Sequence, residues 1–152
     1  MWRVAGVGVD MLQLSRMAGL LQRQSPLRLA RRILHPLEQD QLMAEFGQSS
    51  AADAAALSVP LALHPESDGA VSQWQLRLVR YLGTRWAIKE AAFKAMYPKV
   101  RLDWHQAVIT KQQGKPTLRL MDLPNIECQT SVSHDAGLVI AMVVIEERRP
   151  TA

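Results

Sequence analysis

Hydrophobic residues at the start of the chain recur first with the period of a strand and then with that of a helix. Residues 3–9, RVAGVGV, form a short apolar run that predicts a strand. From Leu12 to Leu21 the apolar positions are spaced three and four residues apart, which predicts a helix. A bare carboxylate, Asp10, stands between these two apolar segments. A charge in that position needs a partner or a function.

The middle of the chain predicts three further helices and one segment of different character. Residues 26–46 predict two short helices broken at Pro36, because Pro26 and Pro36 both suit the first turn of a helix. Residues 73–96 predict one long helix. Residues 47–72 are dominated by Ala, Ser and Pro and have no periodic apolar face. We interpret 47–72 as an inserted, mobile loop.

The last third of the chain alternates in strand fashion and predicts an antiparallel meander. A short SHDAG segment is the expected hairpin connection between its last two strands. A strand, then helices, then a meander predicts an α+β fold, with an antiparallel sheet packed against one long helix and several short ones. With 152 residues and no internal repeat, the chain predicts a single domain, 1–152. The expected strands cover 105–111, 117–121, 126–133 and 138–146.

Composition narrows the class of protein. Hydrophobic residues make up 48% and charged residues 21% of the chain, which is typical of a soluble globular protein. No run is long enough to span a membrane, and the N-terminus shows no signal or transit peptide. Cys128 is the only cysteine, which excludes an intramolecular disulfide framework or a cysteine-based zinc site. We expect its side chain to be buried and to serve only in packing. The net charge of +4 favours an anionic partner, namely nucleic acid, a phosphorylated cofactor or an acidic protein.

The segment WAIKEAAFKA, residues 86–95, predicts a helix that carries a charge toward the core. Glu90 falls one turn after Trp86, on the edge of an apolar stripe, and the opposite side offers only Ile and Ala, so we expect this part to be covered all round. Burying a lone carboxylate costs several kcal/mol unless something pairs with it. Lys94, four residues on, is one candidate partner, and a metal ion is another. The expected stripe is formed by Val79, Leu82, Trp86 and Phe93.

Both acids also have a commonplace explanation. Glu-x-x-x-Lys pairs occur on many solvated helices and stabilise them by only a few tenths of a kcal/mol. Asp10 and Gln13 have the spacing of a capping box at the start of the next helix. Neither acid is specific evidence on its own.

Five segments together resemble the holo-acyl-carrier-protein synthase family, the short 4'-phosphopantetheinyl transferases. The chain opens with G-x-G-x-D followed by an apolar helix that carries an arginine, and RYLGTRWAIKEAAFKA is very similar to the family signature, an aromatic residue followed by x-x-K-E-A-x-x-K-A. The resemblance covers essentially everything except 47–72 and implies the family's 4'-phosphopantetheinyl transferase fold. The five segments are GVGVDMLQLSRM, RLARRILHPLE, RYLGTRWAIKEAAFKA, GKPTLRL and SVSHD.

The resemblance implies a reaction and assigns its central residues. In the family, a serine hydroxyl of an apo-acyl carrier protein attacks the β-phosphate of coenzyme A, which yields the holo-carrier and adenosine 3',5'-bisphosphate. Carried over, Asp10 and Glu90 hold Mg²⁺, which is chemically sound because Mg²⁺ favours one or two carboxylates completed by waters and phosphates. Glu90 is the candidate to take the serine proton, and Lys94 is placed for a phosphate oxygen or the leaving group.

The resemblance also places residues around coenzyme A. Lys115 and Pro116 match the block that lies along the adenine nucleotide, and His134 matches the Ser/Thr-His pair near the 3'-phosphate. Lys89 matches the other signature lysine, for which a phosphate contact and a structural pairing are equally open. Gln13 occupies a position where the family frequently has an acidic residue, so the resemblance gives little support for a third carboxylate ligand at the metal.

Partners follow from the same resemblance. Arg16 matches the arginine that docks the acidic helix of the acyl carrier protein, and Arg23 could extend that patch together with Arg28 and Arg31. Larger phosphopantetheinyl transferases look like two copies of this unit, with coenzyme A in the groove between the halves. This chain holds one copy, so a second wall must come from another subunit, and we expect a homo-oligomer, most simply a trimer.

Two alternatives and the compartment remain open at this point. One alternative is a basic nucleic-acid-binding module built on RLARRIL and on Arg77, Arg80 and Arg85, although aromatic residues are only 5% and no known motif of that class is present. The other is an inactive relative that binds carrier proteins. We expect no membrane partner, and a cytoplasmic location if the protein is bacterial. If the 47–72 insert marks a eukaryotic relative, the expected location is the mitochondrial matrix.

Overall fold

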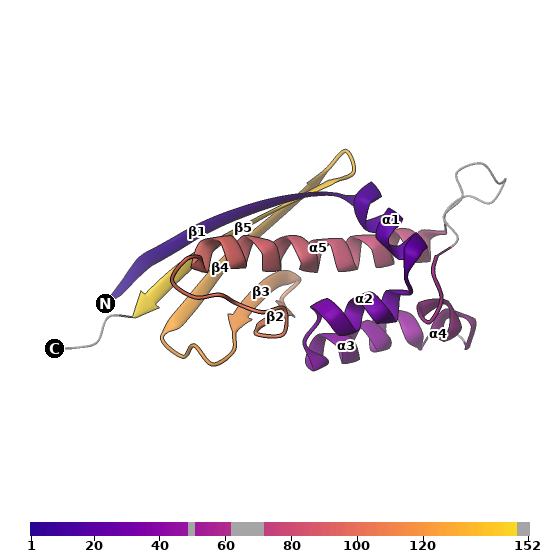
Figure 1. Ribbon diagram of the computed structural model, residues 1–152, viewed down its shortest axis with the longest axis horizontal. Helices are drawn as coiled ribbons and strands as arrows, with labels where there is room; N and C mark the ends of the chain where they lie inside the picture. Colours follow the sequence, from indigo (N-terminus) through magenta and orange to yellow (C-terminus); the bar gives the residue numbers. More distant parts are fainter. Residues whose placement is uncertain (49–50, 62–71, 149–152) are drawn as a thin grey trace.

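A long helix, α5 (Gln73–Met96), lies along a three-stranded antiparallel sheet in the computed structural model (Figure 1). The strand order is β1 (Trp2–Gln13), β5 (Leu138–Arg148) and β4 (Ile126–Asp135). Although α5 is the longest helix, no helix among the described residues is long and apolar enough to cross a membrane. The structure describes residues 1–48, 51–61 and 72–148.

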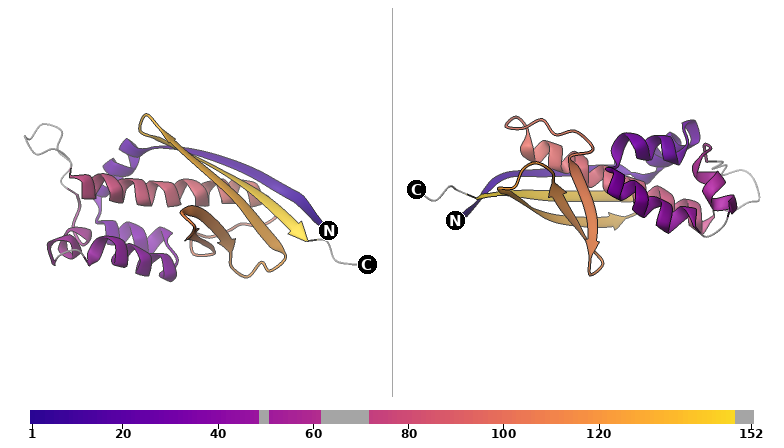
Figure 2. Two further views of the ribbon diagram at one scale, coloured as in Figure 1. Left: turned by 180° about the vertical axis from the view of Figure 1, so that it is seen from behind. Right: turned by 90° about the horizontal axis from the view of Figure 1, so that it is seen from below.

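A second, two-stranded sheet is the hairpin of β2 (Ala107–Gln112) and β3 (Lys115–Leu120). It lies on the other side of α5 from β1 (Figures 1 and 2). The predicted antiparallel α+β fold is confirmed, and the hairpin between β4 and β5 lies where SHDAG predicted it. The single predicted meander is instead divided, because the β4–β5 hairpin takes β1 as its third strand.

Two glycines allow α5 to lie close against β1. A Cβ atom added at Gly6 would overlap the backbone carbonyl oxygen of Ala95, and one at Gly8 would overlap that of Ala91. Because both partners on α5 are alanines, the strand and the helix meet at nearly backbone distance. The apolar run at the N-terminus therefore has glycines where it faces the helix.

Four short helical segments lie between β1 and residue 48, and proline and capping residues set the starts of two of them. Ser25 and His35 each accept a hydrogen bond from the backbone of the helix that they begin, and the prolines that follow them occupy the first turn, as predicted. Glu38 completes a capping box with His35. The segments are α1 (Leu14–Arg23), α2 (Pro26–Ile33), α3 (Pro36–Leu42) and the π-helical turn η1 (Met43–Gly47).

The first strand continues past Asp10, and the predicted capping box at this point is wrong. β1 runs to Gln13, and Asp10 pairs with Ala141 inside the sheet. The helix begins only at Leu14, and Gln13 makes no side-chain capping hydrogen bond. The carboxylate of Asp10 is therefore not used to start a helix.

The interpretation of 47–72 as a loop is wrong for part of that segment. Ala51–Leu57 forms helix α4, which fits the high helix propensity of alanine. Leu57 is fully buried, Leu61 is 5% exposed, and the Leu61 N–H donates to the Leu21 carbonyl at 2.8 Å. The predicted mobility also concerned 49–50 and 62–71, which lie outside the described residues.

The burial of α5 confirms two of the four predicted stripe residues, Val79 and Leu82, and the expected covering of the opposite side. The alanine side of α5, including Ala91 and Ala92, is fully buried, because only small residues fit where the helix meets β1 and β5. Trp86 and Phe93 are only half-buried and instead pack their rings against Trp104, with centroids 4.8 and 5.0 Å away. A large aromatic side chain in the predicted stripe therefore did not indicate full burial at Trp86 and Phe93.

Candidate active site

The two predicted acids meet across the contact of β1 with α5. Lys94 Nζ donates to Asp10 Oδ1 at 2.8 Å and to the Val9 carbonyl at 3.0 Å. Glu90 lies one turn before Lys94 on the same helix. Burial raises the pKa of Glu90, the negative charge of Asp10 raises it further, and Lys94 partly offsets the rise. The two carboxylates are therefore close enough to repel each other.

The contacts of Lys94 decide against the commonplace explanation of this helix. The ion pair of Lys94 with Asp10 joins two elements that are far apart in the sequence, α5 and β1. It does not join two residues on one solvated helix face. The Lys94 side chain is 54% exposed while that of Asp10 is 15% exposed. Lys94 can thus turn toward a ligand, and Asp10 stays at the base of the site.

The residues at this position fit a divalent cation. The negative charge of Asp10 raises the pKa of Glu90, and a cation between the two carboxylates would relieve that repulsion. Mg²⁺ is commonly bound by one or two carboxylates with other oxygens completing its shell. Among the described residues, no group of three or more His, Cys, Asp and Glu side chains could hold a metal ion. An ion at this position would complete its shell with further oxygens, such as those of water or a phosphate.

A basic cavity of about 640 Å³ lies between the first half of α5 and the strands β2 to β4. His134 and Pro116, two of the predicted nucleotide residues, line it. Burial and the neighbouring Arg80 lower the pKa of His134, so this imidazole is neutral at pH 7. Sequence reasoning did not assign the other basic groups to this site; the cations in the cavity wall are Arg77, Arg80, Arg85 and Lys111, and Glu45 is its acid.

Lys115 lies beside this cavity in a second hollow, of about 860 Å³, which Pro116 also lines. The predicted pair Lys115–Pro116 thus separates two adjoining spaces at the start of β3. Cys128 lines the larger space and is half-buried rather than fully buried, and burial raises the pKa of its thiol to about 12. A thiol with that pKa is a poor nucleophile at neutral pH.

The structure does not bring the two halves of the predicted site together in one chain. Asp10 is on β1 and His134 is on β4, and β5 lies between these two edge strands. Figure 1 also shows β1 on one side of α5 and the β2–β3 hairpin on the other. The carboxylate pair and the basic cavity are therefore on opposite flanks of α5.

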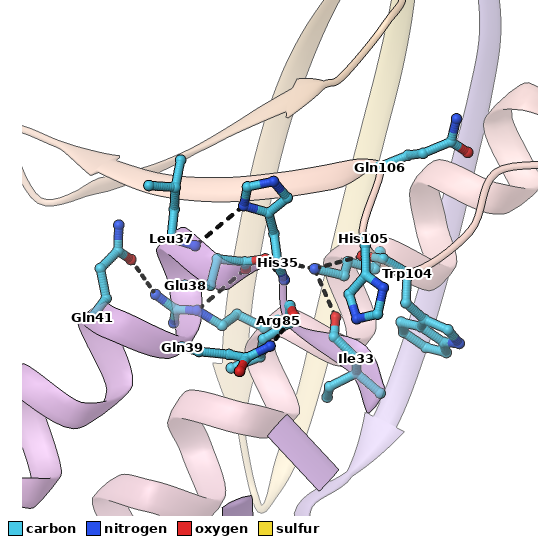
Figure 3. A network of polar contacts seen from close by, with 12 residues as sticks. Ile33, His35, Leu37, Glu38, Gln39, Gln41, Arg85, Trp104, His105 and Gln106 are labelled. Carbon is cyan, nitrogen blue, oxygen red and sulfur yellow. Dashed lines mark hydrogen bonds and ion pairs between the residues drawn. The ribbon is translucent and has the colours of Figure 1, made fainter. Parts of the chain in front are cut away.

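For Lys89 the structure supports the structural alternative, and the predicted contact with coenzyme A is wrong. The side chain is fully buried, and Nζ donates to the Ile33 carbonyl at 2.7 Å, to Glu38 Oε2 at 2.6 Å and to the Trp104 carbonyl at 2.9 Å (Figure 3). An ammonium group has three donors, so none remains for a phosphate. The partner, Glu38, was not recognised from the sequence.

The predicted docking arginines on α1 and α2 have exposed side chains. Arg16 and Arg23 both have exposed side chains and lie two turns apart on α1. The neighbouring α2 adds three more exposed arginines to the same end of the molecule, and α1 and α2 have no acidic residue in their first turns. The additional cations on α2 are Arg28, Arg31 and Arg32.

The chain is similar to known proteins over most of its length. The family model of the 4'-phosphopantetheinyl transferase superfamily matches residues 6–143. The holo-acyl-carrier-protein synthase of Shouchella clausii is 29% identical over 146 residues, which cover 94% of this chain and 98% of the relative. That of Sodalis glossinidius is 32% identical over 122 residues, which cover 78% of this chain and 72% of the relative.

A solved structure shows the same fold. The crystal structure of a holo-acyl-carrier-protein synthase from Bacillus anthracis in complex with CoA superposes with a TM-score of 0.63. It is 21% identical in sequence, and the match covers 95% of this chain and 98% of that one.

Proposed function

Because the chain belongs to the 4'-phosphopantetheinyl transferase superfamily, we propose that it is a holo-acyl-carrier-protein synthase. It transfers the 4'-phosphopantetheine group from coenzyme A to a serine of an apo-acyl carrier protein and releases adenosine 3',5'-bisphosphate. The relatives from S. clausii and S. glossinidius have that name. The observation that carries the proposal is the Asp10–Glu90 pair, which β1 and α5 bring together with Lys94 beside it.

Each residue of this pair has a role in the transfer. Asp10 and Glu90 are the residues that would hold Mg²⁺, which when bound stabilises negative charge on the phosphate groups. The Glu90 carboxylate, directly or through a water molecule, accepts the serine proton as the new O–P bond forms. Lys94, with its exposed side chain, contacts the phosphate oxygen that leaves with the adenosine bisphosphate.

Coenzyme A is an anion at its nucleotide end, and the basic cavity has the matching charge. We assign the 3'-phosphate to His134 and its cationic neighbour Arg80, and the adenine nucleotide to Lys115 and Pro116 at the start of β3. Binding of the anionic coenzyme A then accounts for the net charge of +4, and a nucleic acid partner is not needed to explain it.

The decisive experiment is a mass measurement on the carrier protein. The protein is incubated with coenzyme A, Mg²⁺ and an apo-acyl carrier protein, and the carrier is expected to gain the mass of one phosphopantetheine group. A carrier with its acceptor serine replaced by alanine is the matched control and should stay unchanged. Excess oligonucleotide should not inhibit the reaction. An unmodified wild-type carrier would contradict the proposal.

Arg16→Glu is expected to weaken docking of the carrier protein without affecting coenzyme A. Reversing an exposed charge on α1 repels an acidic partner, so KM for the carrier should rise on the order of tenfold and become less sensitive to salt. Arg148→Glu, an equally exposed reversal at the end of β5, is the control and should leave KM unchanged. Weaker coenzyme A binding in Arg16→Glu would place Arg16 in the nucleotide site instead.

Binding of coenzyme A is expected to draw a proton onto His134. Burial and Arg80 lower the pKa of this histidine in the free protein, whereas a bound phosphate favours the charged imidazolium. Affinity should therefore rise as the pH falls from 7 toward and below the ordinary histidine pKa of 6.5. Calorimetry in two buffers with different ionisation enthalpies measures the proton uptake.

The control for this experiment must separate His134 from the phosphates, which also titrate. His134→Gln should lose the proton uptake, and His105→Gln should keep it, because His105 lies outside the cavity near the Arg31 carbonyl. Equal proton uptake in wild type and His134→Gln would remove His134 from the phosphate site.

An exposed apolar face supports a homo-oligomer. On the side of the sheet away from α5, Val9 pairs with Met142 and Met11 pairs with Ile140. These four side chains are 51%, 42%, 59% and 42% exposed, respectively, which is unusual for contiguous large apolar residues on a monomer. We assign this face to a contact between copies of the chain, arranged as a homotrimer in which neighbouring subunits share each site.

A further inference from the structure

A buried cluster of charges joins α5 to the helix α3 (Figure 3). Glu38 and Lys89 have no exposed surface, and Arg85 is 4% exposed. Lys89 Nζ lies 2.6 Å from Glu38 Oε2, and Arg85 Nε lies 3.6 Å from Glu38 Oε1. One carboxylate of α3 thus faces two cations that are one turn apart on α5.

The hydrogen bonds of Lys89 reach three separate parts of the chain. Its three acceptors are the Ile33 carbonyl at the end of α2, the Glu38 carboxylate of α3 and the Trp104 carbonyl between α5 and β2. Arg85 adds a bond from Nη2 to Gln41 Oε1 at 3.3 Å and stacks over the Tyr81 ring at 3.5 Å. The cluster therefore ties α5 to the end of α2, to α3 and to the segment between α5 and β2.

Stability alone is a weak reason for such a cluster. Removing ions from water costs about as much as their attraction returns, and apolar residues in place of a buried ion pair are often neutral or stabilising. The hydrogen bonds of the cluster restrict both the position and the orientation of α5, because a hydrogen bond weakens when its distance or its angle changes. The close contact of Gly8 with Ala91 on the other side of α5 sets a separation but does not restrict orientation in this way.

Glu90 is the next residue along α5, so its position depends on how Lys89 is held. Consecutive residues in an α-helix differ by about 1.5 Å along the axis and about 100° around it, and a shift of the helix at Lys89 moves Glu90 by the same amount. Asp10 does not follow that shift, because β1 holds it in the sheet. The spacing of the two carboxylates is therefore set by the placement of α5.

We propose that Lys89, held by Glu38, is a positioning residue for phosphopantetheine transfer, and that it sets α5 so that Glu90 faces Asp10 at the working distance. Lys89 does this without touching either substrate. The inference rests on the proposed function, since it concerns the geometry of that same site.

The test removes the charges of Glu38 and Lys89 together, and Arg85 keeps its contacts with Gln41 and the Tyr81 ring. In the Glu38→Gln/Lys89→Met variant, the amide side chain introduced on α3 can still accept from the His35 N–H, and it can donate to a carbonyl that the lysine has left, such as that of Ile33. We expect the variant to remain folded with a melting temperature below that of wild type, because replacing the Glu38–Lys89 pair is often nearly neutral whereas the buried Arg85 loses its ion pair with Glu38. With both substrates saturating, kcat should fall about 10- to 100-fold, while KM for the carrier protein stays within about twofold.

A second variant distinguishes positioning from charge balance. Lys89→Arg keeps a cation opposite Glu38, but its planar fork cannot direct three donors from one nitrogen at the three acceptors. Lys89→Arg should therefore remain folded with a reduced kcat. The control is Arg3→Met/Glu147→Gln, which removes the exposed ion pair between β1 and β5 and should change neither melting temperature nor kcat.

The outcomes separate this inference from the proposed function. An inactive wild-type protein would contradict the proposed function itself. With an active wild type, a folded double variant or a folded Lys89→Arg that keeps wild-type kcat would overturn the positioning role. Failure of both variants to fold would overturn it as well, because the cluster would then be needed for the fold and not for the placement of Glu90.

Discussion

Glu90→Gln and Asp10→Ala are each expected to lower turnover by about 10²- to 10⁴-fold, the range by which a positioned base contributes to a reaction. Glu90→Gln removes the group that accepts the serine proton, and both variants remove half of the carboxylate pair. Initial rates of carrier modification at saturating coenzyme A and Mg²⁺ measure the effect. Full activity in either variant would contradict the assigned site.

The same two variants are expected to remain folded, which separates chemistry from stability. The raised pKa of Glu90 means that the folded state holds this proton more tightly than the unfolded chain does. The charged carboxylate therefore reduces stability as the pH rises from 4.5, the ordinary glutamate value, through the raised value of the folded protein. Glu90→Gln removes that penalty, so its melting temperature at pH 7 should equal or exceed that of wild type.

A matched control shows that loss of turnover is specific to the site. Asp40→Asn neutralises an exposed carboxylate on α3, away from the β1–α5 contact. Its turnover and melting temperature should both match those of wild type, because an exposed charge with no partner in the site contributes little. A large loss in Asp40→Asn would point to a general effect of charge on the reaction.

Local signals in the sequence were sufficient where structure is decided by neighbouring residues. Prolines at the first turns of α2 and α3 and the SHDAG turn gave element positions that the structure confirms. The end of β1 was missed, because Leu12 fits both a helical spacing and the inward face of a strand. Leu12 is 5% exposed and Met11 is 59% exposed, which is the alternation of a strand.

Contacts between distant residues were beyond a single sequence. Lys94 was considered with Glu90, four residues away, but its ion pair is with Asp10 on the first strand. Lys89 has its partner, Glu38, 51 residues earlier in the chain. The resemblance to a family predicts the Asp10–Glu90 pair, because it contains long-range information. Hydrophobic periodicity does not contain that information.

The position of the two half-sites has a consequence for assembly. Within one chain, Asp10 and His134 lie on the two edge strands of the sheet, with β5 between them and α5 packed over β1 and β5. In the proposed site, coenzyme A contacts the carboxylates with its pyrophosphate and the basic cavity with its nucleotide. A neighbouring subunit that supplies the cavity satisfies both contacts, and the exposed face around Val9 and Met142 is available for the packing.

Mixing two inactive variants is therefore expected to restore activity. Asp10→Ala chains keep an intact cavity, and His134→Ala chains keep an intact carboxylate pair. If equal amounts are refolded together and combine at random in a closed ring, about one quarter of the shared sites contain both intact halves. Activity at coenzyme A concentrations below KM should approach about a quarter of the wild-type value, well above either variant alone.

The control mixture tests whether recovery reflects shared sites. Asp10→Ala and Glu90→Gln alter the same half-site, so no arrangement of these two chains gives an intact carboxylate pair, and their mixture should stay inactive. Replacing Val9 by Asp in both partners should also prevent recovery, because a buried charge on the apolar face opposes the contact between subunits. Each outcome constrains the assembly: recovery only in the first mixture requires sites built from two chains, whereas a first mixture no more active than its components places both halves of the site within one subunit.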